Sequence, residues 1–144
     1  MLSFMEYQNP PIIQRASVVV TGDSIATGIG HNSARGNDFS DAQWGRSPSQ
    51  QLHLMINRGH QYYRGRNVII STGILNHEDW NSVEKQFQLL LISKPNTVRV
   101  VGTPFTEYNN KLSALCSRYG FIFMGGYTPG PDGIHPESYA EIDQ

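Results

Sequence analysis

The stretch at residues 17–26, SVVVTGDSIA, decides the fold predicted for this chain. Its valines show no alternation with polar residues, which is typical of a strand that is covered on both faces, as in a parallel sheet. Gly22 permits a sharp turn after the strand because it has no Cβ. Ser24 then follows at the carboxyl end of the strand, the edge where open α/β sheets bind their ligands. Ser24 is therefore either a helix N-cap or a functional hydroxyl.

A second polar cluster lies near the end of the sequence, where residues 132–136 read DGIHP. Serine, histidine and aspartate are the residue types of nucleophilic acyl transfer: the imidazole takes the serine proton, and the carboxylate fixes the imidazole tautomer. Asp132 is close enough to His135 in sequence to bind its ring on one loop. The alternatives are a turn aspartate in the PDG sequence and a surface histidine. The joint occurrence of these residues with Ser24 in a compatible α/β chain favours the catalytic interpretation.

The GDS and D-x-x-H-P motifs together resemble those of the SGNH (GDSL-type) hydrolase family. The resemblance covers nearly the whole chain and implies a flavodoxin-like three-layer α/β/α sandwich. Members of this family are esterases, lipases and carbohydrate deacetylases. The resemblance therefore implies a serine hydrolase in which Ser24 is the nucleophile, His135 the base and Asp132 the acid that orients the base.

Two further blocks of this family have weaker counterparts in the sequence. The family places a glycine on a middle loop and an asparagine after the third strand, and both donate hydrogen bonds to the oxyanion. The resemblance implies that Gly45, in WGRS, and Asn76, in GILN, complete an oxyanion hole with the backbone N–H of Ser24. The GILN sequence departs from the usual G-x-N-D of the family, and Ile25 replaces its usual leucine. His77 is expected either to be an exposed loop residue or to line the substrate pocket.

The rest of the chain alternates predicted strands with predicted helices. Buried strands are expected at 67–72, 98–101 and 121–124, with a short edge strand around 39–44. Helices are expected from a Ser47 cap to Gly59, at 80–93 and at 107–119, and Pro136 is expected to open a last helix. The positions expected to be buried on these helices are Leu52, Met55, Ile56, Trp80, Val83, Phe87, Leu90, Leu91, Tyr108, Leu112, Leu115 and Cys116. This alternation predicts an α/β fold with about five parallel strands and helices on both faces.

Length and composition favour a single domain, and the spacing of its histidines and glycines predicts no cofactor. The 144 residues, 38% hydrophobic and 16% charged, fit a domain at 16–144 after an extended lead-in at 1–15. A formal net charge of −1 argues against nucleic acid or an anionic membrane as the main partner. The single cysteine, Cys116, excludes an internal disulfide and is expected to pack in the core. The five histidines lack metal-ligand spacing and the glycines lack a phosphate-binding pattern, so no metal or other cofactor is predicted.

No segment of the sequence predicts a membrane span or a secretion signal. The apolar run at 89–92 is far too short to cross a bilayer, and the first residues lack a basic region followed by an apolar one. We therefore expect a cytoplasmic protein or part of a larger protein or particle, and the sequence assigns no compartment.

The sequence thus predicts a serine esterase or deacetylase that hydrolyses acetyl or other short acyl esters through an acyl-enzyme. Its expected partner is a small-molecule or carbohydrate ester, on which aromatic side chains such as Trp44 and Tyr127 could stack if they are not in the core. The alternative is an SGNH-fold binding or structural module of a larger assembly with weak catalysis. The presence of all three triad residues favours the enzyme, whereas the departure at Asn76 favours the module.

Overall fold

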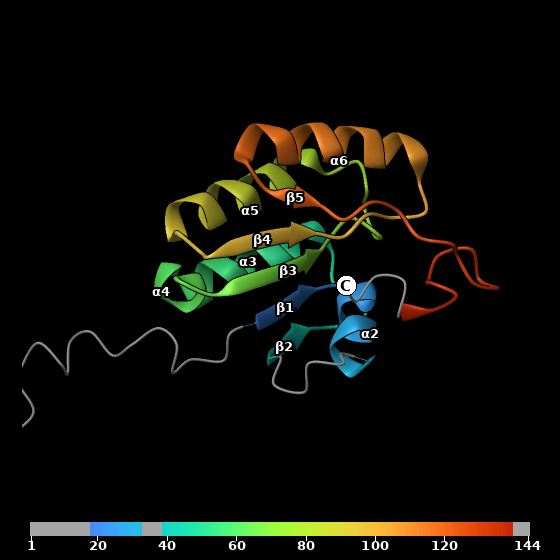
Figure 1. Cartoon of the computed structure of the whole chain (residues 1–144), viewed down its shortest axis with the longest axis horizontal. Helices are drawn as coiled ribbons and strands as arrows, with labels where there is room; N and C mark the ends of the chain where they lie inside the picture. The colour runs from blue at the N-terminus through green and yellow to red at the C-terminus, as the bar shows by residue number, and fades with distance from the viewer. Residues whose placement is uncertain (1–17, 33–38, 140–144) are drawn as a thin grey trace, which may run out of the picture.

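A computed structural model describes residues 18–32 and 39–139, and it contains a five-stranded parallel sheet (Figure 1). The strand order is β2-β1-β3-β4-β5, and every neighbouring pair runs parallel. The strands are β1 (Val18–Gly22), β2 (Phe39–Ala42), β3 (Asn67–Ser71), β4 (Thr97–Val100) and β5 (Ile122–Phe123). The predicted α/β fold with about five parallel strands is confirmed, and the edge strand near residue 39 is present. The expected lead-in at 1–15 lies outside the described residues.

Strand β1 lies inside the sheet, between β2 and β3. Val20 pairs with Ser40 on one side and with Ile69 on the other, and all five residues of β1 are buried. A strand that is paired along both edges and covered on both faces leaves its side chains no contact with water, which explains the valine run. The turn after β1 therefore leaves the sheet from the middle of the fold.

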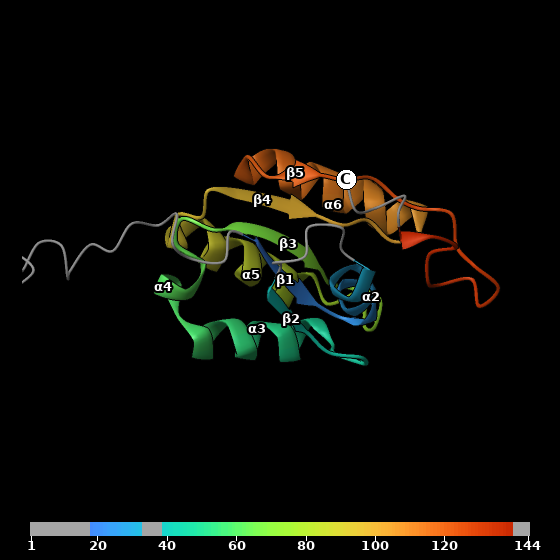
Figure 2. The same ribbon diagram turned by 60° about the horizontal axis from the view of Figure 1, so that its bottom comes forward.

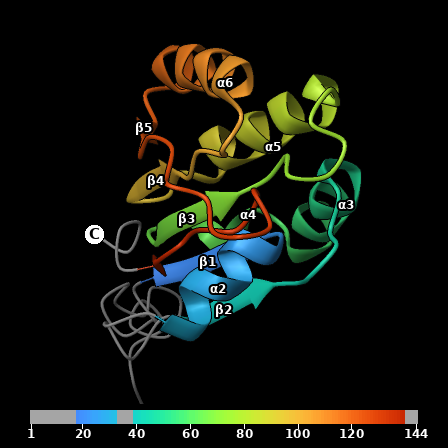
Figure 3. The same ribbon diagram turned by 90° about the vertical axis from the view of Figure 1, so that its right-hand side faces the viewer.

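Helices cover the two faces of the sheet unequally (Figure 2, Figure 3). One face packs against α3 (Pro48–Arg58), α4 (His60–Tyr63), α5 (Trp80–Ser93) and α6 (Thr106–Tyr119), which share one apolar core with it. The other face carries α2 (Ser24–Asn32), whose Ile25 and Ile29 pack in a second core with Val20 and Ile69. The layered arrangement agrees with the predicted sandwich, and α2 begins at Ser24.

The helix boundaries follow the predicted capping signals. Ser47 Oγ accepts a hydrogen bond from the N–H of Gln50, and Gln50 Oε1 accepts one from the N–H of Ser47, at 3.2 and 2.9 Å. These two bonds form the predicted capping box at the start of α3. Gly120 ends α6 in the left-handed conformation, with φ +73°. None of the helices within residues 18–32 and 39–139 is long and apolar enough to span a membrane.

Two buried glutamines set the rotation of α3 and α5 about their axes. Gln51 donates a hydrogen bond to a threonine hydroxyl of β1, and Gln86 donates one to the first carbonyl of α3, both at 2.8 Å. Because these glutamines face inward, Ile56 and Leu91 turn outward and are 57% and 52% exposed. The prediction that both would be buried was wrong, because apolar periodicity does not reveal polar side chains that find partners in the core.

The predicted last helix does not begin at Pro136. Pro136 instead forms an isolated antiparallel bridge with Pro129, and the N–H of Gly130 donates to the carbonyl of His135 at 2.6 Å. Proline favours the first turn of a helix, but the same fixed φ suits an extended bridge whose N–H is not needed. Residues 127–137 therefore form a tight loop, called here the acid–base hairpin.

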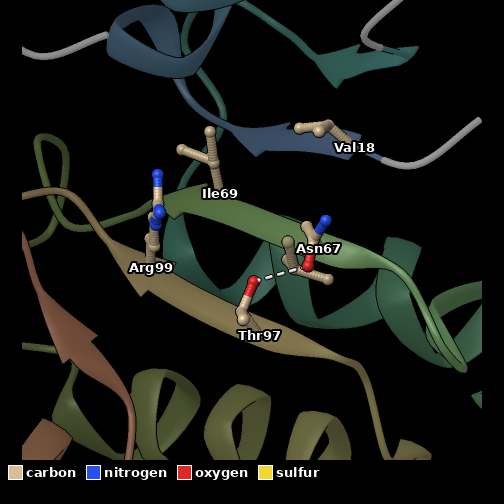
Figure 4. A pocket seen from close by; sticks show the side chains of 6 residues that line it. Val18, Asn67, Ile69, Thr97 and Arg99 are labelled. Carbon is tan, nitrogen blue, oxygen red and sulfur yellow. Dashed lines mark hydrogen bonds between the residues drawn. The ribbon is translucent and has the colours of Figure 1, made fainter. Parts of the chain in front are cut away.

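The two edges of the sheet are different environments. At the amino edge, the first residues of β1, β3 and β4 border an open hollow (Figure 4). Its lining residues are Val18, Asn67, Val68, Ile69, Thr97 and Arg99. The start of α2 and the acid–base hairpin lie at the carboxyl edge instead (Figure 3). None of the predicted site residues lines the hollow, and Ser24 and His135 lie at the edge where parallel sheets bind ligands.

Candidate active site

Ser24 is placed by a turn that only glycine tolerates at its first position. Gly22 has φ +134°, and a Cβ on this residue would stand 1.9 Å from the carbonyl oxygen of Ser71. The chain can therefore leave β1 close against the end of β3 only if residue 22 has no side chain. Ser24 follows as the first residue of α2 and is 6% exposed. Its backbone N–H has no partner within the helix, because the first N–H groups of a helix have none.

Asp23 holds this turn through a buried carboxylate. The side chain accepts hydrogen bonds from the Ser71 hydroxyl and the N–H of Ile25, both at 3.0 Å, and from the N–H of Ile74 at 3.4 Å. It thus ties the start of α2 to the end of β3 and the loop that follows. Burial raises the pKa of Asp23 to about 6, and the hydrogen bonds from Ser71 and the backbone oppose that rise.

His135 comes to Ser24 from a position 111 residues away in the sequence. Its Nε2 lies 2.9 Å from Ser24 Oγ, and its Nδ1 lies 2.5 Å from Asp132 Oδ2. The three side chains predicted as a triad therefore form one continuous hydrogen-bonded chain. In the tautomer with the proton on Nδ1, the Nε2 lone pair faces the serine hydroxyl.

The acid–base hairpin fixes Asp132 and His135 by local bonds. Asp132 Oδ1 accepts hydrogen bonds from the N–H groups of Ile134 and His135, both at 2.9 Å. The hydrogen bond with the His135 ring, followed by these two backbone bonds, lowers the pKa of Asp132 to about 2. Tyr127 is 8% exposed and donates to the carbonyl of Ile134 at 2.6 Å. Of the two interpretations of Tyr127, the core position is confirmed. Its ring is buried and therefore does not offer an exposed face on which a sugar could stack.

Gly45 lies on an exposed turn beside the site. Gly45 has φ +75° and follows Trp44, whose ring centre is 5.1 Å from that of His135. The N–H of Gln43 donates to the carbonyl of Gly22 at 3.1 Å, so this turn is anchored to the strand that precedes Ser24. Within the described residues, Gly45 makes no hydrogen bond with Ser24 or His135. The turn is brought to the site, and the role of its N–H stays a prediction.

Asn76 lies on the loop after β3 and is exposed, with φ +51°. Its carbonyl accepts a hydrogen bond from the N–H of Asp79 at 2.9 Å, which stabilises the turn before α5. Ile74, two residues earlier, contacts Asp23, so the loop reaches the edge of the site. In the described part of the chain, the Asn76 side chain has no hydrogen bond to Ser24 or His135. Its predicted place in an oxyanion hole therefore stays a prediction.

His77, for which two interpretations were open, is a surface residue beside an aromatic group. Its side chain is 57% exposed, and its ring centre lies 5.4 Å from that of Phe105 and 6.5 Å from that of Tyr108. His77, Trp80 and Tyr108 also line a small surface pocket, whose lining includes neither Ser24 nor His135. The exposed-loop interpretation is confirmed.

Two other groups bear on what chemistry the site can perform. Cys116 is buried, and burial raises the pKa of its thiol to about 12, so it is not a thiolate nucleophile. Within residues 18–32 and 39–139, no three His, Cys, Asp or Glu side chains gather as metal ligands would. The hydrogen bond between His135 Nε2 and Ser24 Oγ is the geometry in which an imidazole can remove a serine proton.

Arg46 is a site-supporting residue that the sequence did not reveal. Its Nη1 donates to the carbonyl of Asp41 at 2.9 Å and to Gln51 Oε1 at 2.8 Å. Asp41 in turn binds Arg58 through both carboxylate oxygens, at 2.9 and 3.2 Å. Arg46 thereby fixes the end of the turn that carries Trp44. The one feature of the sequence that could have indicated this role is the position of Arg46 directly after Gly45, the predicted oxyanion glycine.

Comparisons with known proteins identify a shared fold. No family model matches the sequence, and no curated protein matches it. Among solved structures, one similar chain is the crystal structure of a "putative acylhydrolase" from Bacteroides fragilis NCTC 9343. The match has a TM-score of 0.70 at 15% sequence identity and covers 99% of this chain and 91% of the other. At that identity the likeness shows the fold: this chain has the α/β architecture of that Bacteroides protein over nearly the full length of both.

Proposed function

We propose that the protein is a serine hydrolase that cleaves carboxylic esters with short acyl groups through an acyl-enzyme intermediate. The observation that supports this most is the chain Ser24 Oγ–His135 Nε2 and His135 Nδ1–Asp132 Oδ2, with distances of 2.9 and 2.5 Å. The nucleophile, the base and the acid occupy the order and spacing that serine acyl transfer requires. The description of the structurally similar Bacteroides protein as a "putative acylhydrolase" supports the same class of reaction.

In the acylation step, His135 Nε2 takes the proton of Ser24 as Oγ bonds to the carbonyl carbon of the ester. The carbonyl electron pair moves to its oxygen and gives a tetrahedral oxyanion. When this collapses, the bond between the carbonyl carbon and the alcohol oxygen breaks, and the alcohol oxygen takes the proton from Nε2. Asp132 stays ionised and stabilises the imidazolium, in keeping with its lowered pKa.

In the deacylation step, water replaces the serine hydroxyl as the nucleophile. His135 takes a proton from that water, the oxygen bonds to the acyl carbon, and the acyl–Oγ bond breaks with return of the proton to Ser24. The products are the carboxylic acid and the free enzyme. The N–H of Ser24, as the first residue of α2, is the donor best placed for the oxyanion. The N–H of Gly45 and the amide of Asn76 are the two further donors that we assign to it.

The proposed substrates are small-molecule or carbohydrate esters with an acetyl or other short acyl group. The reaction proposed needs no metal or other cofactor, because the base and the nucleophile are both supplied by side chains. Nucleic acid is not a proposed partner, in keeping with the near-neutral charge. The second candidate is a binding or structural module. The exposed position of Asn76 favours it, since this predicted oxyanion donor makes no hydrogen bond to Ser24 or His135 within the described residues.

The test of the proposed function is Ser24→Ala, assayed on p-nitrophenyl acetate. We expect kcat/KM to fall by at least about 10³-fold, because no other group can form the acyl-enzyme. The melting temperature should change little, since the substitution removes one hydroxyl. A fluorophosphonate should label Ser24 in the parent protein and leave the alanine variant unlabelled.

Ser117→Ala is the matched control, because Ser117 is an exposed residue in the last turn of α6, which leads to the amino-terminal end of β5, at the opposite edge of the sheet from Ser24. It should keep full activity and labelling. Full activity in Ser24→Ala would exclude this mechanism. A parent protein that neither hydrolyses esters nor reacts with the fluorophosphonate would favour the binding module.

A further inference from the structure

Trp44 is a large apolar side chain that is exposed to solvent and yet contacts the proposed base. It is 65% exposed, and its ring centre lies 5.1 Å from that of His135 with 36° between the planes. It is a member of neither apolar core of the described residues. We propose, on the basis of the proposed function, that Trp44 binds the alcohol half of the substrate and that this alcohol carries a ring.

The indole is presented by a fixed turn. On one side, the N–H of Gln43 donates to the carbonyl of Gly22, at the end of β1. On the other side, Arg46 binds the Asp41 carbonyl and Gln51 Oε1 with its guanidinium, and its N–H donates to the Gln43 carbonyl at 3.4 Å. A side chain on such a turn loses little conformational freedom when a ligand binds, which favours a binding surface prepared in advance.

The reaction places the alcohol next to this indole. Both nitrogens of His135 are engaged, Nδ1 by Asp132 and Nε2 by Ser24, so Trp44 contacts the imidazole away from these bonds. The alcohol oxygen must come within about 2.6–3.2 Å of Nε2 to receive its proton. The acyl group remains on Ser24 until water releases it. The half of the ester that lies beside His135, and therefore beside Trp44, is the alcohol.

The chemistry of an exposed indole favours a ring on that alcohol. An indole offers a flat apolar face, which a pyranose covers with its axial C–H groups and a phenyl group covers by offset stacking. A short linear alcohol covers far less of that face. The shared chemistry is a cyclic alcohol, and sugar esters and aryl esters are its two sources, which the experiment separates.

The experiment compares variants on acetate esters that differ only in the alcohol. Ethyl acetate, phenyl acetate and an acetylated methyl pyranoside give the same acetyl-enzyme, so differences between them arise before the alcohol leaves. Expressing each variant relative to the parent cancels the intrinsic reactivity of each ester. For Trp44→Ala we expect kcat/KM to fall at least about tenfold more on one or both ring esters than on ethyl acetate.

Two further variants make this comparison specific. Trp44→Phe keeps a flat ring and should recover most of the ring-ester activity. Ile92→Ala removes a side chain of similar exposure, 63%, from the far end of α5 and should leave the ratio between esters unchanged. Equal losses on all three esters in Trp44→Ala would mean that Trp44 only positions His135, and would overturn the proposal.

A binding measurement separates this proposal from the proposed function. The chain has two tryptophans, so 5-fluorotryptophan in Ser24→Ala gives two fluorine signals, which Trp44→Phe assigns. Titration with either ring ester should shift the Trp44 signal, and ethyl acetate at equal concentration should not. A shift without turnover in the parent protein would retain the binding site and reject the esterase. Turnover in the parent protein without a shift of the Trp44 signal and without a preference for ring esters would retain the esterase and reject the binding site. The ring ester that reaches half of its maximal shift at the lower concentration binds more tightly and identifies the source of the ring.

Discussion

The turn that carries Ser24 and the acid–base hairpin reach the same edge of the sheet by different physical means. The turn follows β1, is buried against the end of β3 and has no room for a side chain at Gly22. The hairpin is largely exposed and is held by its own backbone bonds, such as the one from Gly130 to His135. Ser24 is therefore fixed by the core, and His135 by a loop that could be altered without disturbing the core.

The two aspartates of the site express this difference. Asp23 is 2% exposed, and burial raises its pKa to about 6. Asp132 has a side chain that is 52% exposed, and hydrogen bonds lower its pKa to about 2. The buried carboxylate constrains the backbone at an electrostatic cost, whereas the exposed one serves as partner to the imidazole. Substitutions in the buried turn should therefore change the stability of the protein, whereas substitutions in the exposed hairpin should leave its stability largely unchanged.

The largest expected effect is the contrast between Gly22→Ala and Gly133→Ala. Both glycines have positive φ, +134° and +73°, but only at Gly22 does a Cβ meet backbone, 1.9 Å from the Ser71 carbonyl. We expect Gly22→Ala to lower the free energy of unfolding by at least about 3 kcal/mol, because strain and a clash with β3 combine. Gly133→Ala has open space and should cost about 1 kcal/mol. Urea unfolding measures both.

Ester hydrolysis by the same two variants gives a second measure of the difference between Gly22 and Gly133. Gly22→Ala displaces Ser24 from His135 and should lose ester hydrolysis together with stability. Gly133→Ala should retain most of both. Equal destabilisation by the two substitutions would contradict the view that the core fixes only the first region.

The sequence predicted those parts of the molecule that depend on local signals. The valine run, the Ser47 capping box and the glycine after α6 each act within a few residues, and the structure has all three. The positions that were missed depend on distant partners. Gln51 and Gln86 are buried because they find hydrogen bonds on other elements, and this leaves Ile56 exposed.

The candidate site divides in the same way. Motif types predicted Ser24, Asp132 and His135, and the fold brings them within hydrogen-bond distance. Whether the loops at Gly45 and Asn76 direct their donors toward the same point depends on turn geometry that single residues do not encode. The contact between Trp44 and His135 joins segments about ninety residues apart, and no pattern in either segment predicts it.

The next effect in size is the loss of activity in Asp132→Asn. The amide keeps an oxygen for the two backbone N–H groups but presents an NH₂ group or a weaker acceptor to His135 Nδ1, which favours the wrong tautomer. In a serine protease this change costs about 10⁴ in kcat. We expect a fall in kcat of about 10²–10³-fold here. The carboxylate position is half-exposed, so a water molecule can accept the hydrogen bond from Nδ1–H in its place. Steady-state kinetics on p-nitrophenyl acetate measures the loss.

The stability of Asp132→Asn should stay close to that of the parent protein. The side chain is exposed, and the bonds that close the hairpin come from other residues. A variant with parental kcat/KM would mean that Asp132 is only a turn residue, and one that unfolds would mean that the hairpin depends on the charge.

The smallest expected effect is a pH dependence of stability that belongs to Asp23. Its pKa is about 6 in the folded protein and 3.8 in an unperturbed chain. Between these values the folded state binds more protons than the unfolded state, so the free energy of unfolding falls as the pH rises. The contribution is fully present below about pH 4 and is lost above about pH 6, with a total of about 3 kcal/mol. From about pH 4.5 to pH 7.5, the parent should lose about 2 kcal/mol from this carboxyl.

Asp23→Asn and Asp132→Asn form the matched pair for this effect. The asparagine at position 23 does not titrate, so this variant should lose about 2 kcal/mol less than the parent over the same interval. The contribution of Asp132 to the pH dependence of stability has the opposite sign. Because its pKa is lowered, this contribution is present above the ordinary value of 3.8 and is lost as the pH falls toward 2, which is below the measured interval. Asp132→Asn should therefore keep the parental slope. Unfolding by urea at the two pH values gives both slopes. If Asp23→Asn has the same slope as the parent, the buried carboxylate is not the group that titrates, and the contrast between the two aspartates fails.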